Sequence, residues 1–312
     1  MRTSPAPTVP RAARPADSLG TQGIVHSPSV ATPGRCTFRR GSGVLNVAHR
    51  GASAAAPENT LAAIRKAIGR GSDLIELDVQ RTRDGALVLL HDTTLTRTTN
   101  VREVFPRRAP WRVRDFTYTE ILRLDAGSRW SSPYAGETIP TLEQAIEVLQ
   151  QSRSGLLLEL KATAQYPGIV PEVAAALRAT PGYLDSAIEA RRLFVESFDV
   201  ASMHELKVLA PSVPVGLLGT PARGRLSALA TWADQINPRY WSVDASYVAA
   251  VHEHGMDCLV WTVNRASAMR RALQMGVDGI ITDRPDRLHE VLDGWMPITR
   301  TAGRGGGIRT RG

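Results

Sequence analysis

Residues 73–79 read Asp-Leu-Ile-Glu-Leu-Asp-Val, an apolar run that carries Glu76 and Asp78 two positions apart. Alternate side chains of a β-strand point the same way, so a strand here directs both carboxylates to one side and its isoleucine, leucine and valine to the other. Inside a parallel barrel, such neighbouring carboxylates repel each other and lose hydration unless a cation lies between them. Oxygen ligands favour a hard cation such as Mg²⁺ or Ca²⁺. An exposed strand end with solvated acids is the alternative.

Three further apolar runs end in polar residues. The run at 156–161 repeats the two-residue spacing, so a strand would point Glu159 and Lys161 to the same side. Lys161 is one of only three lysines in a chain with 35 arginines, which indicates a need for a compact charge at this position. The polar ends of the other two runs are His49 with Arg50 and His91 with Asp92. For each pair taken alone, an ordinary strand end or a self-neutralising ion pair is the alternative.

Short apolar runs alternate with segments of helical period along the chain, which is typical of βα units around a parallel sheet. Leu61, Ile64 and Ile68 follow helical spacing, for example. Thr141 and Gln144 form a capping box at the start of another helix.

We predict an α/β fold, a TIM (β/α)8 barrel whose polar strand ends meet at the C-terminal face, where such barrels build active sites. Nine strand candidates compete for eight barrel positions, and the seventh is the weakest. They are Val44–Ala48, Asp73–Val79, Leu87–His91, Leu156–Leu160, Leu193–Phe198, Val213–Leu218, Tyr240–Val243, Leu259–Val263 and Gly279–Thr282.

An insertion at about residues 92–140 follows the third predicted strand and contains one modest helical stretch, near Thr119–Leu124. Insertions of this length in a compact domain usually shape a site. Between Arg97 and Asp115 it carries six arginines against two acids. We expect these arginines either to attract a phosphate or, transiently, a membrane surface, or to form a solvated loop face.

The formal net charge of +8 is carried by the two ends of the chain. Residues 1–43 hold six arginines and one aspartate, residues 300–312 hold four arginines and no acid, and residues 44–299 hold 28 basic against 29 acidic side chains. A near-neutral body is not typical of a nucleic-acid-binding domain, so we expect no specific nucleic-acid partner. We predict one barrel domain over 44–299, flanked by a disordered Arg/Pro-rich tail at 1–43 and a disordered Gly/Arg tail at 300–312.

Cysteine usage and hydropathy exclude several other classes of protein. Cys36 and Cys258 lie 222 positions apart and form neither a disulfide framework nor a zinc ligand set. The chain has no run of 18 apolar residues, and its N-terminus lacks the apolar core of a secretory signal. We therefore expect a cytoplasmic protein; the sequence makes no prediction of its oligomeric state.

The candidate site residues suit phosphodiester hydrolysis better than acyl transfer. No serine or cysteine lies in a nucleophile elbow, and no glycine-rich phosphate loop is present. A cation held by Glu76, Asp78 and Glu159 would polarise a phosphoryl oxygen. Two histidines on opposite sides of the phosphorus could act as general base and general acid.

These residues lie in a series of short motifs spread over about residues 44–292. The motifs are His49-Arg50-Gly51, Pro57-Glu58-Asn59-Thr60, Glu76-Leu77-Asp78-Val79, His91-Asp92 with Leu95 and Arg97, Ile139 to Glu143, Glu159-Leu160-Lys161, Val260 to Asn264 and Gly276 to Pro285. Together they closely resemble the glycerophosphodiester phosphodiesterase family. Glu58 has no certain role in its motif, and capping of a helix start together with Asn59 is a sufficient explanation for it.

The resemblance implies a TIM barrel with a small insertion after the third strand. It also implies a set of site residues: Glu76, Asp78 and Glu159 bind one divalent cation, Mg²⁺ or Ca²⁺; His49 and His91 are the acid/base pair; Arg50 and Lys161 hold the phosphate; and Trp261 lines the substrate face.

The implied reaction belongs to lipid and glycerol metabolism. A glycerophosphodiester, the product of phospholipid deacylation, is hydrolysed to sn-glycerol 3-phosphate and an alcohol, either through a cyclic phosphate or by direct attack of water. The alternatives are a lysophospholipase-D-type activity on lysophospholipids and a catalytically silent barrel that only binds phosphodiesters. An apolar groove beside the arginines of the insertion would favour a lipid substrate, and a narrow polar mouth would favour a deacylated one.

Overall fold

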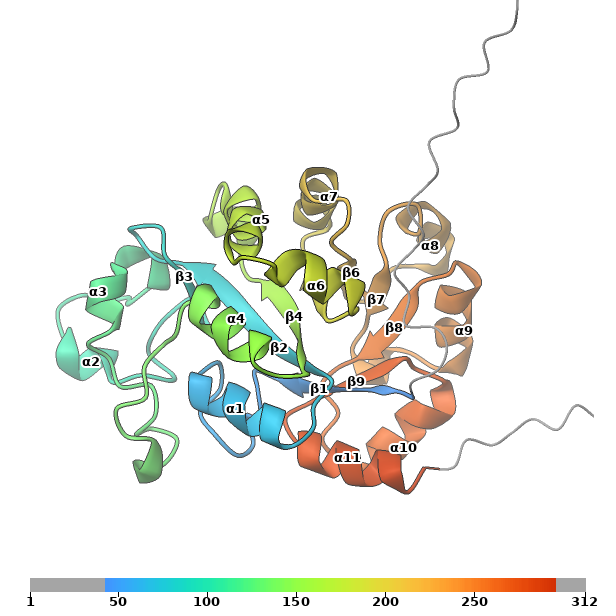
Figure 1. The fold of residues 1–312 in the computed structure, drawn as a ribbon, viewed down its shortest axis with the longest axis horizontal. Coiled ribbons are helices and arrows are strands. Elements are labelled where there is room, and N and C mark those ends of the chain that lie inside the picture. The colour runs from blue at the N-terminus through green and yellow to red at the C-terminus, as the bar shows by residue number, and fades with distance from the viewer. Residues whose placement is uncertain (1–42, 296–312) are drawn as a thin grey trace, which may run out of the picture. The chain divides into compact units, whose positions relative to one another are not determined.

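The computed structural model describes residues 43–295, so our predictions for the two tails fall outside the described residues, apart from Gly43. Eight parallel strands close into a barrel in the order β1-β9-β8-β7-β6-β5-β4-β2, with β2 pairing back to β1 (Figure 1). This confirms the predicted TIM barrel. The barrel strands are β1 (Leu45–His49), β2 (Leu74–Arg81), β4 (Gly155–Leu160), β5 (Leu193–Ser197), β6 (Val215–Leu218), β7 (Gln235–Asn237), β8 (Asp257–Val260) and β9 (Gly279–Thr282).

The helices that lie between the barrel strands and after the last of them pack around the outside of the barrel (Figure 1). They are α1 (Leu61–Gly69), α4 (Leu142–Gln150), α5 (Ile169–Ala179), α6 (Tyr183–Glu189), α7 (Val200–Leu209), α8 (Arg223–Leu229), α9 (Ala245–Glu253), α10 (Ala266–Met275) and α11 (Pro285–Asp293). Two 3-10 helices lie in loops, η3 (Thr163–Gln165) and η4 (Tyr240–Ser242). No helix within residues 43–295 is both long and apolar enough to cross a membrane.

Alternation along β2 and β4 divides their side chains between two cores, as the spacing predicts. Ile75 and Leu77 of β2 belong to the outer core, between the strands and the helices. Leu74 of β2 and Leu157 of β4 belong to a smaller core inside the barrel. Because alternate residues share a face, the inner face of β2 continues with two acids, and that of β4 continues with Glu159. The barrel interior is therefore apolar at the N-terminal end of these strands and acidic at the C-terminal end.

The seventh predicted strand, Tyr240–Val243, is wrong. Its first three residues form η4, and β7 lies five residues earlier, at Gln235–Asn237. Gln235 and Asn237 are fully buried in the barrel, so this strand has no apolar alternation that the sequence could reveal.

The third predicted strand forms, but it is not a barrel strand. β3 (Leu87–Leu89) pairs antiparallel with β2 and stands outside the closed barrel. Because β3 runs antiparallel to β2, the residues after β3 lie beside Asp78, whose backbone carbonyl accepts a hydrogen bond from the Leu90 N–H at 2.9 Å. His91 follows directly, so it reaches the site on a loop rather than at the end of a barrel strand.

The insertion at 92–140 folds around a small core of its own. Leu95, Val101, Phe116 and Ile121 are fully buried in that core. Its helices are α2 (Val101–Val104), α3 (Tyr118–Ile121), and the 3-10 helices η1 (Val113–Asp115) and η2 (Ser132–Tyr134). α3 matches the predicted helical stretch to within a few residues, whereas α2 is not predicted from the sequence.

Candidate active site

Three carboxylates meet inside the C-terminal end of the barrel. Glu76 and Asp78 come from β2 and Glu159 from β4, where Asp78 and Glu159 are register partners. One oxygen from each lies within 4.8 Å of the others, and all three residues are buried. Glu76 Oε1 is buried without a hydrogen-bond partner, and the buried Asp78 Oδ1 has only an ion-pair contact with Lys161 at 3.2 Å. An unpartnered carboxylate oxygen in so tight a group of acids fits a hard divalent cation, which would supply the missing partner.

Burial and mutual repulsion affect the ionisation of these acids. Burial, reinforced by the charges of Asp78 and Glu159, raises the pKa of Glu76 well above its usual range. Burial and the charge of Asp78 raise the pKa of Glu159 to about 8. Burial would also raise the pKa of Asp78, but Lys161, Arg50 and other nearby donors hold it well below its usual range. Without a cation the group therefore tends to retain protons, and a cation would displace them.

Arg50 and Lys161 surround Asp78 with positive charge. Arg50 Nε lies 3.3 Å from Asp78 Oδ2, and Lys161 Nζ lies 3.2 Å from Asp78 Oδ1. Lys161 also donates to Glu159 Oε1 at 2.8 Å. Asn59 Nδ2 donates to Asp78 Oδ2 at 2.8 Å, so its side chain supports the acid group. Thr60, and not Asn59, caps α1, by accepting from the Ala63 N–H.

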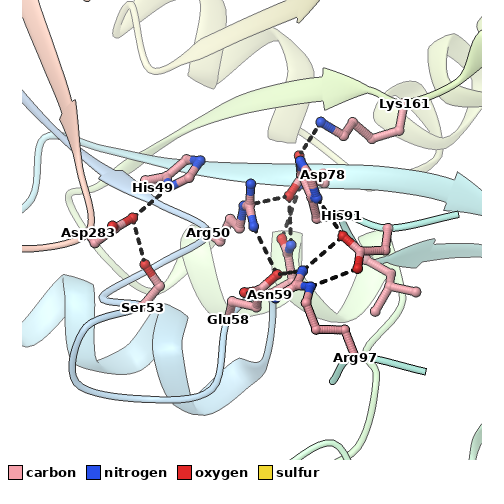
Figure 2. A network of polar contacts seen from close by, with 12 residues as sticks. His49, Arg50, Ser53, Glu58, Asn59, Asp78, His91, Arg97, Lys161 and Asp283 are labelled. Carbon is pink, nitrogen blue, oxygen red and sulfur yellow. Dashed lines mark hydrogen bonds and ion pairs between the residues drawn. The ribbon is translucent and has the colours of Figure 1, made fainter. Parts of the chain in front are cut away.

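His49, at the end of β1, is held by an aspartate from the end of β9. His49 Nδ1 lies 2.6 Å from Asp283 Oδ1 (Figure 2). Ser53 Oγ donates to the same oxygen at 3.1 Å, and Asn264 Nδ2 donates to Asp283 Oδ2 at 2.6 Å. Burial would raise the pKa of Asp283, but these donors hold it below its usual value. An ionised aspartate can only accept, so Nδ1 carries a proton, and in the neutral imidazole the lone pair lies on Nε2.

His91 is held in the same way on the other side of the acids. Its Nδ1 lies 2.8 Å from Asp92 Oδ1, and Arg97 donates to Asp92 from Nε at 2.7 Å. Arg97 also donates to Glu58 from both terminal nitrogens, at 2.6 and 2.7 Å. Glu58 in turn accepts from Arg50 Nη1 at 3.0 Å, so one chain of ion pairs joins the insertion to the β1 loop (Figure 2). Glu58 therefore has a role that helix capping does not explain.

These side chains open into one cavity of about 150 Å³. Of the eight predicted site residues, seven line it: His49, Arg50, Glu76, His91, Glu159, Lys161 and Trp261. The eighth, Asp78, lies beneath them and contacts Arg50 and Lys161. A larger recess of about 850 Å³ lies at the N-terminal ends of β1, β2 and β4, and holds none of the eight.

Several residues of this site lie outside the set predicted from the sequence. Asp283 is part of the last of the motifs, but its contact with His49 spans 234 positions and cannot be predicted from local sequence. Glu196 of β5, Phe198 and Arg239 also line the cavity. The two-residue spacing that revealed the other acids could have revealed Glu196, since Phe194 and Glu196 share the inner face of β5. Nothing in the sequence marks Arg239.

Comparison with known proteins places this arrangement in a family. The model of the glycerophosphoryl diester phosphodiesterase family matches residues 49–287. A glycerophosphodiester phosphodiesterase of Caldanaerobacter subterraneus is 38% identical over 248 residues, which are 78% of this chain and 96% of that protein. One from Bacillus subtilis is 32% identical over 81% of this chain and 87% of that protein.

Solved structures agree with the sequence matches. An Oleispira antarctica phosphodiesterase in complex with the product sn-glycerol 3-phosphate has a TM-score of 0.70 at 30% identity, covering 81% of this chain and 97% of that one. A glycerophosphodiester phosphodiesterase of Agrobacterium tumefaciens has a TM-score of 0.65 at 30% identity, covering 78% and 98%. The chain therefore belongs to the glycerophosphoryl diester phosphodiesterase family and is a phosphodiesterase.

Proposed function

We propose that the chain hydrolyses a glycerophosphodiester to sn-glycerol 3-phosphate and an alcohol with the help of one divalent cation. Three buried acids, two basic side chains and two aspartate-held histidines converge on one small cavity, and this convergence is the main support for the proposal. Together these groups meet the needs of phosphodiester hydrolysis: the cation and the basic side chains would neutralise the phosphate, and the two histidines would activate a nucleophile and protonate a leaving group.

Glu76, Asp78 and Glu159 would hold the cation, with Mg²⁺ or Ca²⁺ as the ion that suits oxygen ligands. When bound, the ion supplies Lewis-acid polarisation of a phosphoryl oxygen. The unpartnered Oε1 of Glu76 supports this assignment, because a buried carboxylate oxygen without any partner is costly.

Arg50 and Lys161 would bind the phosphate. Both line the cavity and lie on either side of Asp78. The planar guanidinium of Arg50 can donate two parallel hydrogen bonds, whereas the Lys161 ammonium acts as a compact charge. Glu58 orients Arg50 by accepting from Nη1, which leaves the other terminal nitrogen for the substrate.

His49 and His91 would move the protons. Each histidine presents Nε2, because its Nδ1 is bound to an aspartate. One would take a proton from the nucleophile, and the other would protonate the oxygen of the departing alcohol. Burial lowers the pKa of His91, so at neutral pH it starts as the neutral imidazole, which suits a base. Direct attack by water and attack by a substrate hydroxyl to give a cyclic phosphate use the same groups.

The surroundings of the insertion favour a deacylated substrate over a lysophospholipid. The recess beside Arg97 has a volume of only about 230 Å³. Its lining mixes the charged Glu58, Arg97 and Arg129 with the apolar Pro57, Ala126 and Trp130. An acyl chain needs a long apolar groove, which this recess does not provide. The cytoplasmic location and a transient membrane contact of the insertion stay predictions.

A substrate panel tests the proposal. Purified protein is given glycerophosphodiesters and lysophospholipids of matched head group, each with Mg²⁺, Ca²⁺ or EDTA. We expect release of sn-glycerol 3-phosphate from the deacylated compounds only, and only with a cation. Faster release of alcohol from lysophospholipids would instead support the lysophospholipase-D alternative, and binding without turnover would support a silent barrel.

A further inference from the structure

The side of the cavity away from the phosphate-binding residues carries an arginine to which the reaction scheme assigns no role. Arg239 follows β7, and β7 lies directly opposite β2 in the order of the eight barrel strands. Arg239 and Glu76 therefore line the same cavity from opposite sides. A phosphodiester whose phosphate lies beside Arg50 and Lys161 can extend one of its two arms toward Arg239, which lines the same cavity.

The Arg239 guanidinium lies over two tryptophan rings. It lies 4.9 Å from the ring centre of Trp261 and 5.7 Å from that of Trp241. Phe198 contacts Trp261 edge to face, with ring centres 5.7 Å apart. Trp241 is 68% exposed and Phe198 is 52% exposed, so both remain open to a ligand. The Trp261 ring is fixed in its orientation, because its Nε1 also donates to the Asn237 carbonyl at 2.8 Å.

The charge of Arg239 is not neutralised by an acid. Arg50 and Lys161, the other two permanent cations of the cavity, are paired with carboxylates. Within residues 43–295, no ion pair or side-chain hydrogen bond holds the Arg239 guanidinium; its contacts are with the two indole rings. Glu196 lines the same cavity but is only 1% exposed, and it accepts from Asn237 Nδ2 at 2.6 Å instead.

We propose that Arg239 selects the alcohol part of the substrate, favouring neutral polyhydroxylated or anionic head groups over ammonium ones such as choline and ethanolamine. This inference rests on the proposed function. Aromatic walls of this kind would normally attract a quaternary ammonium through the ring faces. Here a guanidinium already lies over both indoles, so a second cation loses that attraction and meets a like charge.

The same guanidinium can bind other alcohols by donating hydrogen bonds to them. Arginine has five N–H donors and no acceptor, and stacking on an indole leaves the donors at its edge directed outward. Hydroxyl groups, a carboxylate or a phosphate on the alcohol can accept from them. By Coulomb's law, two unit charges about 6 Å apart in a wet cavity change binding about three- to tenfold, which sets the size of the expected discrimination.

A pair of substrates that differ in the charge of the alcohol tests this inference. Release of sn-glycerol 3-phosphate is measured from glycerophosphoglycerol, which has a neutral alcohol, and from glycerophosphocholine. The readout is the ratio of the two kcat/KM values, because the ratio cancels effects on folding and on cation binding. We expect Arg239→Gln to shift the ratio about three- to tenfold toward glycerophosphocholine, and Arg239→Lys, which retains the charge, to shift it less.

The matched control is Arg270→Gln, on the exposed surface of α10, which makes the same change in net charge and lies outside the cavity. We expect this variant to leave the ratio unchanged. If Arg239→Gln hydrolyses both substrates at the wild-type ratio, Arg239 does not contact the alcohol and the inference is wrong. If the wild-type protein releases no sn-glycerol 3-phosphate from either substrate with a cation present, the proposed function fails instead.

Discussion

Both histidines of the site are bound through Nδ1 to an aspartate that is itself fixed by other donors. Asp283 is held by Ser53 and Asn264, and Asp92 is held by Arg97. The donors keep both aspartates ionised, and the pKa of Asp92 falls to about 2, chiefly through its bonds with Arg97. Each imidazole is therefore fixed in the tautomer and orientation that presents Nε2.

His49→Ala and His91→Ala test the two proton-transfer roles. We expect each variant to lose about 10²–10⁴-fold in kcat, because general acid or base groups typically contribute that much. Steady-state kinetics on glycerophosphoglycerol measure the loss, and a cation-induced rise in Tm shows that the acid group is intact. Wild-type kinetics in either variant would remove that histidine from the reaction.

Asp283→Asn tests the positioning of His49. An asparagine amide would donate to Nδ1, which forces the imidazole proton onto Nε2, so we expect kcat to fall about 10²–10⁴-fold with a much smaller change in KM. Nitrogen chemical shifts of His49 should report the change of tautomer, which a purely structural defect would not cause. Ser53→Ala removes a donor to the same aspartate oxygen and should cost far less. An unchanged tautomer in Asp283→Asn would contradict this role.

At the scale of elements, the loop between β1 and α1 positions Arg50 by close packing of the backbone. Gly51 has a φ of 78°, and a Cβ added there would lie 2.7 Å from the carbonyl carbon and the Cβ of Ala63 in α1. The glycine thus lets the chain turn directly against the helix, so that the Arg50 N–H reaches Glu76 Oε2 at 2.8 Å. Only glycine combines this φ with so close an approach.

We expect Gly51→Ala to lower the free energy of unfolding by about 2–4 kcal/mol, the combined cost of a left-handed φ and of overpacking against α1. Urea unfolding measures the change. The control is Gly69→Ala, at the end of α1 itself, because no atom lies within 4 Å of the added Cβ. This substitution should change the free energy of unfolding by about 1 kcal/mol or less. Equal effects of the two substitutions would show that the loop can move away from α1.

Elements with a clear period could be predicted from the sequence, and those without one could not. β2 and β4 are apolar runs that carry acidic residues near their C-terminal ends, and α4 has both an apolar stripe and a capping box, so the positions of these elements follow from local pattern. β7 could not, because its inward side chains are amides. The antiparallel direction of β3 depends on its pairing with β2, and the Asp283 contact depends on closure of the whole barrel. Such long-range pairings leave no mark on local sequence.

At the scale of the whole molecule, the charge of the chain is less informative than its distribution. The body is nearly neutral, yet it concentrates three buried acids at one end of the barrel. Closing the barrel forces these acids out of water, so the fold itself disfavours their ionised forms when no cation is present.

Stability of the cation-free protein should therefore fall as pH rises. The pKa of Glu159 is about 8 in the fold and about 4.5 in an unfolded chain, so above pH 4.5 the folded state retains a proton that unfolding releases, and the associated stability is lost as pH rises through about 8. We expect the free energy of unfolding in EDTA to be lower at pH 8.5 than at pH 7.

Urea unfolding at the two pH values measures this difference. Excess Mg²⁺ or Ca²⁺ should remove it, because a cation binds the deprotonated acids of the folded state. Glu159→Gln should reduce it even in EDTA. Equal free energies at pH 7 and pH 8.5 for the wild-type protein in EDTA would contradict the raised pKa.

We propose that three barrel acids bind the one cation that hydrolysis needs. The test is the rate of sn-glycerol 3-phosphate release by wild-type and Glu76→Ala protein, first in EDTA and then with Mg²⁺ or Ca²⁺ added back. We expect no release in EDTA, recovery of the wild-type rate with a cation, and no recovery in Glu76→Ala, which should remain folded because the substitution removes a repelled, buried charge. Release in EDTA at the full rate, or full recovery in Glu76→Ala, would contradict the claim.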